Sequence, residues 1–217
     1  MEIVQFFIDF IIHVESHLDY IFTHYAELSY VILFLIIFAE TGLIIFPFLP
    51  GDSLLFALGA FSARGTISYI QMGVALFIAA VLGDFLNYYI GKNYGRRFLQ
   101  SRWCRFVKEE HLNKAQVFYE KYGAKTIVLA RFMPIIRTFA PFVAGIGQMD
   151  KKVFLIYNIF GAFVWIFSFL TLGHFFGNMP QIKENFKLVI VVIIILSILP
   201  AVVAIVKEKL KKNSEEI

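Results

Sequence analysis

Charged side chains are scarce in this chain, in which 17% of the 217 residues are charged and 59% are hydrophobic. About a quarter of the residues in a soluble globular protein are charged, so this balance excludes an ordinary soluble fold. Cysteine is almost absent, and a lone Cys104 excludes an internal disulfide or a cysteine-based zinc site. Residues 1–63 contain no lysine or arginine. Without a basic start or a small-residue cleavage site, we do not expect a signal peptide.

Long apolar runs are present instead, and they predict membrane-spanning helices. One run contains a single charge, Asp84, and two others contain none. About 20 apolar residues cross a bilayer as a helix. We therefore predict an all-α integral membrane protein. Its three full spans are expected at 67–91, 153–177 and 188–206.

Basic residues are unevenly distributed, and their distribution predicts the topology. Nine lie in residues 92–125 and four in the basic-then-acidic tail at 207–217, whereas residues 1–63 hold seven acids. Because basic flanks stay in the cytoplasm, we predict a cytoplasmic loop with an amphipathic helix at 92–125, a cytoplasmic C-terminus and an external N-terminus. Residues 1–27 are expected to form an interfacial helix. Beside membrane spans, the basic groups indicate topology and anionic head groups, and not nucleic acid.

Two further apolar segments, 28–62 and 126–149, contain residues that break a membrane helix. If each segment enters and leaves by one face, the first has both flanks outside and the second has both flanks in the cytoplasm. The prolines supply the break that such a hairpin needs. We predict two opposed re-entrant helical hairpins. The hairpin-forming residues are Pro47, Pro50, Gly51 and Pro134.

The two halves of the chain also resemble each other. Proline and glycine positions recur in the same order at offsets of 82 to 87 residues. This pattern predicts an inverted-topology repeat, an architecture of secondary transporters, with a site where the broken segments meet. Residues 1–206 then form a single membrane domain. The matches are Pro47 with Pro134, Gly59 with Gly145, Gly91 with Gly173, and Gly95 with Gly177.

Four charged residues in these hairpins are costly to place in lipid: Glu40, Asp52, Arg131 and Arg137. A charge at the centre of a bilayer costs about 2.5–3.5 kcal/mol on insertion scales, so such residues are functional candidates. The first hairpin supplies only acids and the second only arginines. Guanidinium groups suit a lipid phosphate, and carboxylates suit a carried proton.

Simpler roles are open for the same residues. Asp52 follows a proline-glycine pair, so it could cap the returning helix. Glu40 and Arg131 could neutralise each other as a buried ion pair. Arg137 could lie at an aqueous mouth and extend its charge to water. We place three further residues in a second rank: Asp84, which we expect to pair with a lysine or arginine, Ser53 and Thr138.

Enzyme classes find little support. A lipid-phosphate phosphatase needs a histidine nucleophile in a Ser-Gly-His type motif, which none of the five histidines occupies. An ATP-driven pump needs a phosphate-binding loop that ends in Gly-Lys-Ser/Thr, and Gly91-Lys92-Asn93 is not one. His174 has no partner histidine at metal-ligand spacing. We expect no enzyme, no metal and no cofactor.

Several motifs together resemble the DedA family of bacterial inner-membrane proteins, part of the wider group with a VTT domain. "FAETGLIIFPFLPGDSLLFALGAFSARG", "GDFLNYYIGKNYG" and "YNIFGAFVWIFSFLTLGHFFG" carry the resemblance, which covers residues 1–206. So does "FYEKYGAKTIVLARFMPIIRTFAPFVAGIGQM". The family patterns E-x(6)-P-x-x-PGDS and R-F-x-P-x-x-R-T are intact.

The resemblance implies opposed re-entrant hairpins and lipid transport across the bacterial cytoplasmic membrane. Family members are linked to undecaprenyl phosphate and to phospholipids such as phosphatidylethanolamine, and some to the proton motive force. The expected partners are membrane lipids, above all a phosphate-bearing lipid, together with protons; a homo-oligomer is compatible with the sequence. The alternative is a non-transporting membrane scaffold. The resemblance also implies that four residues are essential for transport: Glu40, Asp52, Arg131 and Arg137.

Overall fold

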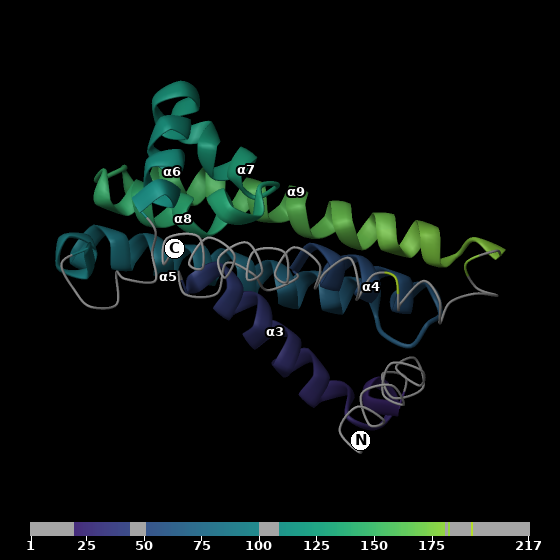
Figure 1. Cartoon of the computed structure of the whole chain (residues 1–217). Helices are drawn as coiled ribbons and strands as arrows, with labels where there is room; N and C mark the ends of the chain where they lie inside the picture. Colours follow the sequence, from purple (N-terminus) through teal and green to yellow (C-terminus); the bar gives the residue numbers. More distant parts are fainter. Residues whose placement is uncertain (1–19, 44–50, 100–108, 181, 183–191, 193–217) are drawn as a thin grey trace, which may run out of the picture. The chain divides into compact units, whose positions relative to one another are not determined.

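The computed structural model describes residues 20–43, 51–99, 109–180, 182 and 192. These residues form helices and turns, without a strand, as the sequence predicts (Figure 1). The elements are α3 (Ala26–Gly42), α4 (Gly51–Ala63), α5 (Tyr69–Leu99), α6 (Glu109–Tyr122), the 3-10 turn η2 (Gly123–Lys125), α7 (Thr126–Ala130), α8 (Pro134–Ile146) and α9 (Lys151–Gly177).

Two helices are long and apolar enough to cross a membrane, over Tyr69–Gly95 in α5 and Lys151–Gly177 in α9. They coincide with two of the predicted spans. Helix α5 continues beyond residue 91, the predicted end of the first span, to Leu99. Its last turns carry lysine and arginine, which are good helix formers and are favoured near a helix C-terminus. The third predicted span, 188–206, lies outside the described residues apart from residue 192.

Each predicted hairpin segment contains two helices. In the first, α3 and α4 flank residues 44–50, which carry Pro47 and Pro50 and lie outside the described residues. In the second, α7 ends at Ala130, and Met133 N donates to Ala130 O at 2.9 Å to close a tight turn. Helix α8 then begins at Pro134. Proline is well suited to the first helical position because its missing N–H has no partner there in any case.

The chain divides into two compact units, and each contains segments from both halves of the sequence. The first unit contains α4 and the end of α9. The second contains most of α3 and α5, all of α6 to α8, and the first two thirds of α9. Their ranges are Met1–Ser29, Pro50–Tyr69 and Phe169–Ile217 for unit 1, and Tyr30–Leu49 and Ile70–Ser168 for unit 2.

In unit 1, the backbone of α4 lies directly against the last turns of α9. A Cβ atom on Gly59 would lie 2.2 Å from the carbonyl oxygen of Leu170. One on Gly173 would lie 2.0 Å from the carbonyl oxygen of Phe56. Both distances are far below van der Waals contact, so only glycine permits this approach.

In unit 2, α8 and the last turns of α5 approach each other in the same manner. A Cβ atom on Gly145 would lie 2.2 Å from the carbonyl oxygen of Tyr88, and one on Gly91 would lie 2.3 Å from that of Phe142. The contacts in the two units match at constant offsets. Positions on the shorter helix differ by 86 residues, and positions on the longer helix differ by 82. The pairs are Phe56 and Phe142, Gly59 and Gly145, Tyr88 and Leu170, and Gly91 and Gly173.

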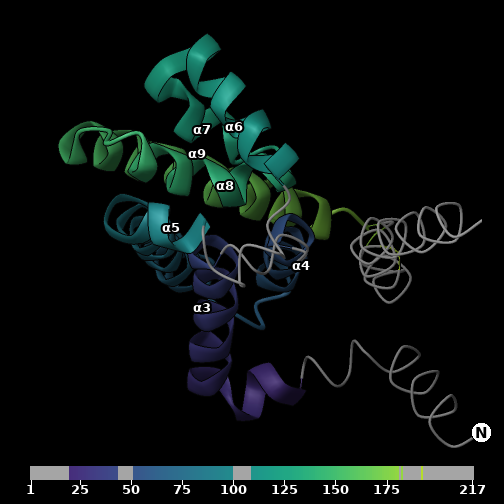
Figure 2. The same ribbon diagram turned by 60° about the vertical axis from the view of Figure 1, so that its left-hand side comes forward.

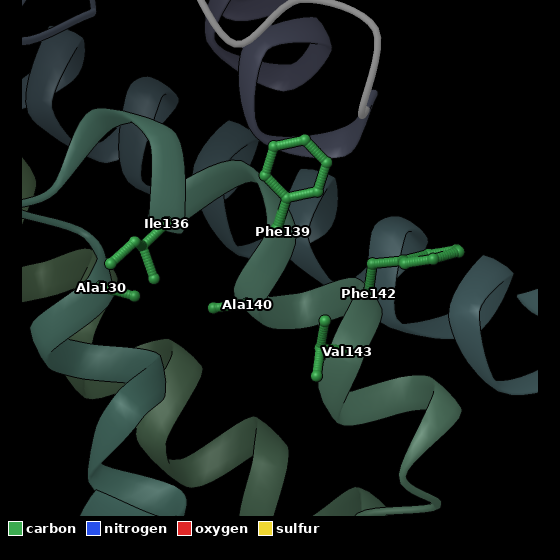
Figure 3. Packing of buried hydrophobic residues seen from close by; sticks show 6 residues of the cluster. All are labelled: Ala130, Ile136, Phe139, Ala140, Phe142 and Val143. Atoms are coloured by element: carbon green, nitrogen blue, oxygen red, sulfur yellow. The ribbon is translucent and has the colours of Figure 1, made fainter. Parts of the chain in front are cut away.

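Helix α6 packs against α8 in unit 2 (Figure 2). It also packs against an apolar cluster formed mainly by α8 (Figure 3). Tyr119 on α6 packs against this cluster and donates its hydroxyl to the carbonyl oxygen of Ala140 at 3.0 Å. Burial raises the pKa of Tyr119, so the hydroxyl keeps its proton and the bond at neutral pH. The cluster residues are Ala130, Ile136, Phe139, Ala140, Phe142 and Val143.

Candidate functional site

Unit 2 contains a buried ion pair between α3 and α8. Arg137 Nη2 donates to Glu40 Oε1 at 2.5 Å. Beside Glu40, helix α3 crosses α5 closely at Gly83, where a Cβ atom would lie 2.0 Å from Thr41 Oγ1. Glu40 and Arg137 are at most 4% exposed, so both charges depend on protein partners.

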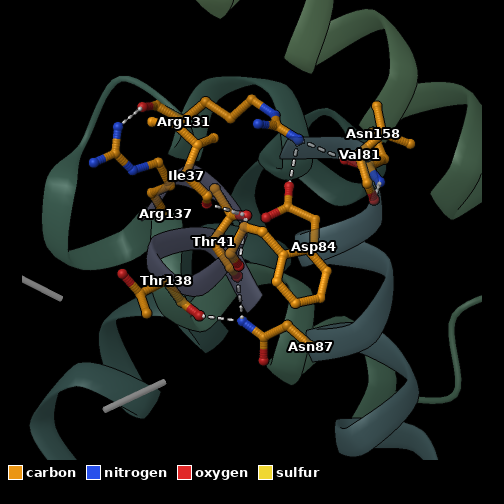
Figure 4. A network of polar contacts seen from close by, with 10 residues as sticks. Ile37, Thr41, Val81, Asp84, Asn87, Arg131, Arg137, Thr138 and Asn158 are labelled. Atoms are coloured by element: carbon orange, nitrogen blue, oxygen red, sulfur yellow. Dashed lines mark hydrogen bonds and ion pairs between the residues drawn. The ribbon is translucent and has the colours of Figure 1, made fainter. Parts of the chain in front are cut away.

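A second buried ion pair joins α5 to the turn between α7 and α8. Arg131 Nη2 donates both to Asp84 Oδ2 and to Asn158 Oδ1, the latter at 2.5 Å (Figure 4). Asn158 on α9 is itself held, because its Nδ2 donates to the carbonyl oxygen of Val81 at 3.0 Å. Arg131 is therefore fixed by two long helices, once through a charged acceptor and once through a neutral one.

The stem of Arg131 fits beside Gly161 on α9. A Cβ atom at this glycine would lie 3.1 Å from Cδ and from Nε of the arginine. The two arginines are also linked, because Arg137 Nη1 donates to the carbonyl oxygen of Arg131 at 3.4 Å. Any larger residue at position 161 would have to push the arginine aside.

The indole of Trp165 on α9 contacts both guanidinium groups. Cζ of Arg137 lies 4.7 Å from the ring centroid, and Cζ of Arg131 lies 5.8 Å from it. Tryptophan is the strongest aromatic partner for a cation, and desolvation strengthens the contact to about 2 kcal/mol or more. The fully buried ring therefore helps to hold two like charges in one apolar region.

Asn87 connects three helices of the site. Its Nδ2 donates to the carbonyl oxygens of Thr41 on α3, at 3.2 Å, and Thr138 on α8, at 2.7 Å. Both NH₂ hydrogens are thus used, and the amide on α5 fixes the spacing of the helices that carry Glu40 and Arg137. Figure 4 shows this bridge below the two arginines.

Some polar atoms of the site have no hydrogen-bond partner among the described residues. They include Nε and Nη1 of Arg131, and Oδ1 of Asp84. A guanidinium has five N–H groups, and Nη2 of Arg131 uses its two on Asp84 and Asn158. Three donors of a fully buried cation are left for a further acceptor. The site can therefore bind an anion, and Asp84 Oδ1 can accept a proton.

The structure brings several of the predicted site residues together in unit 2. Arg131 and Arg137 lie side by side, and Asp84 pairs with an arginine as expected. The alternative pairing of Glu40 with Arg131 is wrong, because Glu40 pairs with Arg137 and Arg131 pairs with Asp84. The aqueous mouth for Arg137 is also wrong, since the side chain is buried.

The remaining predicted residues play other parts. Asp52 and Ser53 belong to unit 1 and lie in the first turn of α4, which begins at Gly51. Because α4 begins at Gly51, Asp52 lies inside the helix and not before it as a cap. A carboxylate in the first turn is stabilised by the helix dipole. Thr138 is buried, and its carbonyl oxygen accepts from Asn87. In the part of the chain that the structure describes, no three acidic, histidine or cysteine side chains could hold a metal ion.

Three residues of the site were not identified from the sequence: Asn87, Asn158 and Trp165. A signal was present in their spacing. Asn87 lies three residues after Asp84, and Trp165 lies seven residues after Asn158, so each pair occupies one face of its helix. Burying an amide side chain in an apolar span costs free energy unless the amide is hydrogen-bonded. The two asparagines therefore indicate helix faces that contact other polar groups.

Comparison with known proteins identifies the family. The VTT domain matches residues 49–175. Protein DedA of Escherichia coli K12 is 47% identical over 211 residues, which cover 96% of each chain. The chain belongs to the DedA family. An uncharacterized membrane protein of Mycobacterium leprae, ML0287, is 40% identical over 169 residues, covering 78% of this chain and 76% of its own.

A more distant relative, inner membrane protein YqjA of Escherichia coli K12, is 29% identical over 187 residues and covers 83% of this chain and 85% of its own. No solved structure matches the chain. With two helices able to span a bilayer and relatives named as membrane proteins, this DedA-family chain is a membrane protein.

Proposed function

We propose that this DedA-family protein moves a phosphate-bearing lipid across the cytoplasmic membrane. The observation that carries the proposal is Arg131, a buried cation with three N–H donors that have no partner among the described residues. A phosphate oxygen is a strong acceptor for such donors. Arg137 is held beside it by Trp165 and offers a second guanidinium to the same head group. Undecaprenyl phosphate and phospholipids such as phosphatidylethanolamine are the candidate lipids.

The architecture that suits this role is an inverted repeat with two opposed re-entrant hairpins. The matched glycine contacts of α4 with α9 and of α8 with α5 support it, because equivalent positions make equivalent contacts. In this arrangement the N-terminus is external and the C-terminus cytoplasmic. Both arms of each hairpin enter and leave by one face, and transport proceeds by motion of one repeat against the other.

Protons are the proposed driving partner. Glu40 and Asp52 lie on helices of the first hairpin segment, and a carboxylate can take a proton from one face and release it to the other. Glu40 is also paired with Arg137, so its charge state affects the arginine that would bind the lipid. The protein supplies no covalent chemistry in this mechanism and acts as a transporter, not as an enzyme.

Reconstitution tests the proposal. The purified chain is placed in liposomes with a panel of labelled lipids that share acyl chains and differ in the head group, with and without a pH gradient. Phosphate-bearing lipids should move across the bilayer, and the matching diacylglycerol should gain no rate from the protein. A non-transporting scaffold would leave every rate at the level of empty liposomes.

A further inference from the structure

Asp84 accepts a hydrogen bond from Arg131, and other N–H groups of that guanidinium have no partner among the described residues. Arg131 Nη2 donates to both Asp84 and Asn158, whereas Nε and Nη1 have no partner among the described residues. The acid faces inward from α5, and it is only 2% exposed. An incoming anion that reached Arg131 would meet the Asp84 charge directly.

The charges of the site balance before any ligand enters. Two carboxylates, Glu40 and Asp84, face two guanidiniums, Arg131 and Arg137, and all four residues are buried. A phosphodiester brings one further negative charge. An uncompensated charge in a buried site is strongly unfavourable, so the anion needs either a new cation or the loss of one negative charge.

A proton on Asp84 would restore the balance. Its Oδ1 has no hydrogen-bond partner in the described part of the chain, so it can take up a proton without breaking an existing bond. Arg131 would not be released by this change. Asn158 is neutral at every pH and would keep its bond to Nη2 while the carboxylate lost its charge.

The surroundings of Asp84 contribute few other ionisable groups. Arg131 faces it from the turn after α7, and the charge of Arg137 reaches it from α8. Tyr119 on α6 interacts with it electrostatically but stays protonated. Helix α9 contributes the neutral Asn158, and the acid of α3, Glu40, is bound to Arg137.

We propose that a lipid phosphate displaces Asp84 from Arg131, that Asp84 takes up one proton as it gives way, and that Asn158 keeps Arg131 in position throughout. The inference rests on the proposed function and adds the counter-ion that couples one proton to one phosphate charge. Asn158 is a positioning residue in this scheme. The only bond that forms is the O–H bond at Asp84 Oδ1, made with a proton that the buffered solution supplies, while the ion pair of Arg131 exchanges the carboxylate for the phosphate.

The experiment is calorimetric titration of the purified full chain with dihexanoyl phosphatidylglycerol, a soluble lipid with one phosphodiester. Measurements in two buffers with different heats of ionisation give the number of protons taken up for each lipid bound. Wild type should take up about one proton or more, and its Kd should rise about tenfold per pH unit for each proton. Dioctanoyl glycerol, which has no phosphate, should not bind.

Variants then assign the proton. Asp84→Asn should bind the lipid with about one proton fewer, whereas Asp84→Glu should keep the proton count. Asn158→Ala should weaken binding at every pH and leave the count unchanged. Glu120→Gln removes an exposed acid on α6 and is the matched control, with unaltered binding. An unchanged proton count in Asp84→Asn would overturn the proposal.

Two further outcomes are distinguishable. If the wild-type chain binds no phosphatidylglycerol and moves no lipid, the proposed function itself fails. If Asp84→Asn does not fold, difference infrared spectroscopy of the wild type replaces it, with ¹³C-labelled aspartate. Addition of the lipid should then produce the carboxyl band of a protonated aspartate, and a spectrum without that band would contradict the exchange.

Discussion

Trp165 lies against the guanidinium of Arg137, with the ring centroid 4.7 Å from Cζ. The contact is completely buried, and the same ring reaches Arg131 at 5.8 Å. An aromatic face stabilises a cation without neutralising it, which an acid cannot do. The ring therefore helps to keep both arginines in place without adding a negative charge to the site.

The first prediction concerns this ring. Trp165→Phe should retain part of the lipid transport, because phenylalanine keeps a weaker cation–π contact. Trp165→Leu should reduce transport about tenfold or more, since about 2 kcal/mol of stabilisation is lost in a desolvated site. Initial rates in liposomes measure the effect, and size-exclusion profiles confirm folding. Equal rates in the two variants would mean that the ring only fills space.

The second prediction concerns Glu40 and Arg137. Arg137→Lys should be markedly impaired although it keeps the charge, because an ammonium cannot reproduce the planar, two-pronged contact. Arg137→Leu should also lose about 3–5 kcal/mol of stability, because it leaves a buried carboxylate without its partner. Transport rates and thermal unfolding separate these two effects. Wild-type transport by Arg137→Lys would argue against phosphate binding at this residue.

The double exchange Glu40→Arg with Arg137→Glu distinguishes a structural ion pair from a site. A purely structural pair should regain folding and activity together. If Arg137 binds the lipid, the exchange should regain stability and stay inactive.

In the same assay, Glu40→Gln and Asp52→Asn should slow transport driven by a pH gradient more than downhill equilibration, because amides cannot carry protons.

The third prediction uses the close helix contacts. Gly145→Ala should destabilise the protein by about 1–3 kcal/mol, because its Cβ would lie 2.2 Å from the carbonyl oxygen of Tyr88. Gly59→Ala should behave alike, since it meets Leu170 at the same distance. Gly147→Ala is the control, with its nearest contact at 3.3 Å, and should change the stability by about 0.5 kcal/mol or less. Thermal melts in detergent give the comparison.

The fourth prediction concerns topology. On a background without Cys104, a cysteine at Gly65 should react with an impermeant reagent from outside, and cysteines at Lys121 and Lys151 should both react from the cytoplasm. The last two flank the second hairpin segment, so the same accessibility is expected if that segment does not cross the membrane. Reaction of these two positions from opposite faces would identify an ordinary span.

The sequence predicted the charged part of the site because charges in apolar runs are conspicuous. Arg131, Arg137 and Glu40 were ranked first and Asp84 second on that basis. Asp52 was ranked first as well, but it belongs to unit 1. Their pairing was not predictable, because it depends on which faces of α3 and α5 turn toward α8. Spacing along the chain contains no such information for residues about fifty to a hundred positions apart.

The neutral members were missed for a different reason. Asn87 and Asn158 carry no charge, so composition and hydropathy hardly register them, although each bonds to groups on two helices or turns. Trp165 resembles any other aromatic residue of an apolar helix until its neighbours are known. The continuation of α5 to Leu99 was not predicted, because its basic last turns were assigned to the cytoplasmic loop.

Helices α4 and α5 are made early in synthesis, but the surfaces that their glycines leave open are filled by α8 and α9. Gly59 meets Leu170, and Gly91 meets Phe142, so neither half of the chain can complete a unit alone. During biogenesis the glycine faces of α4 and α5 therefore have no packing partner until the second half is inserted. A chain cut between the halves would assemble only if both fragments were present together, each supplying the surface that the other lacks.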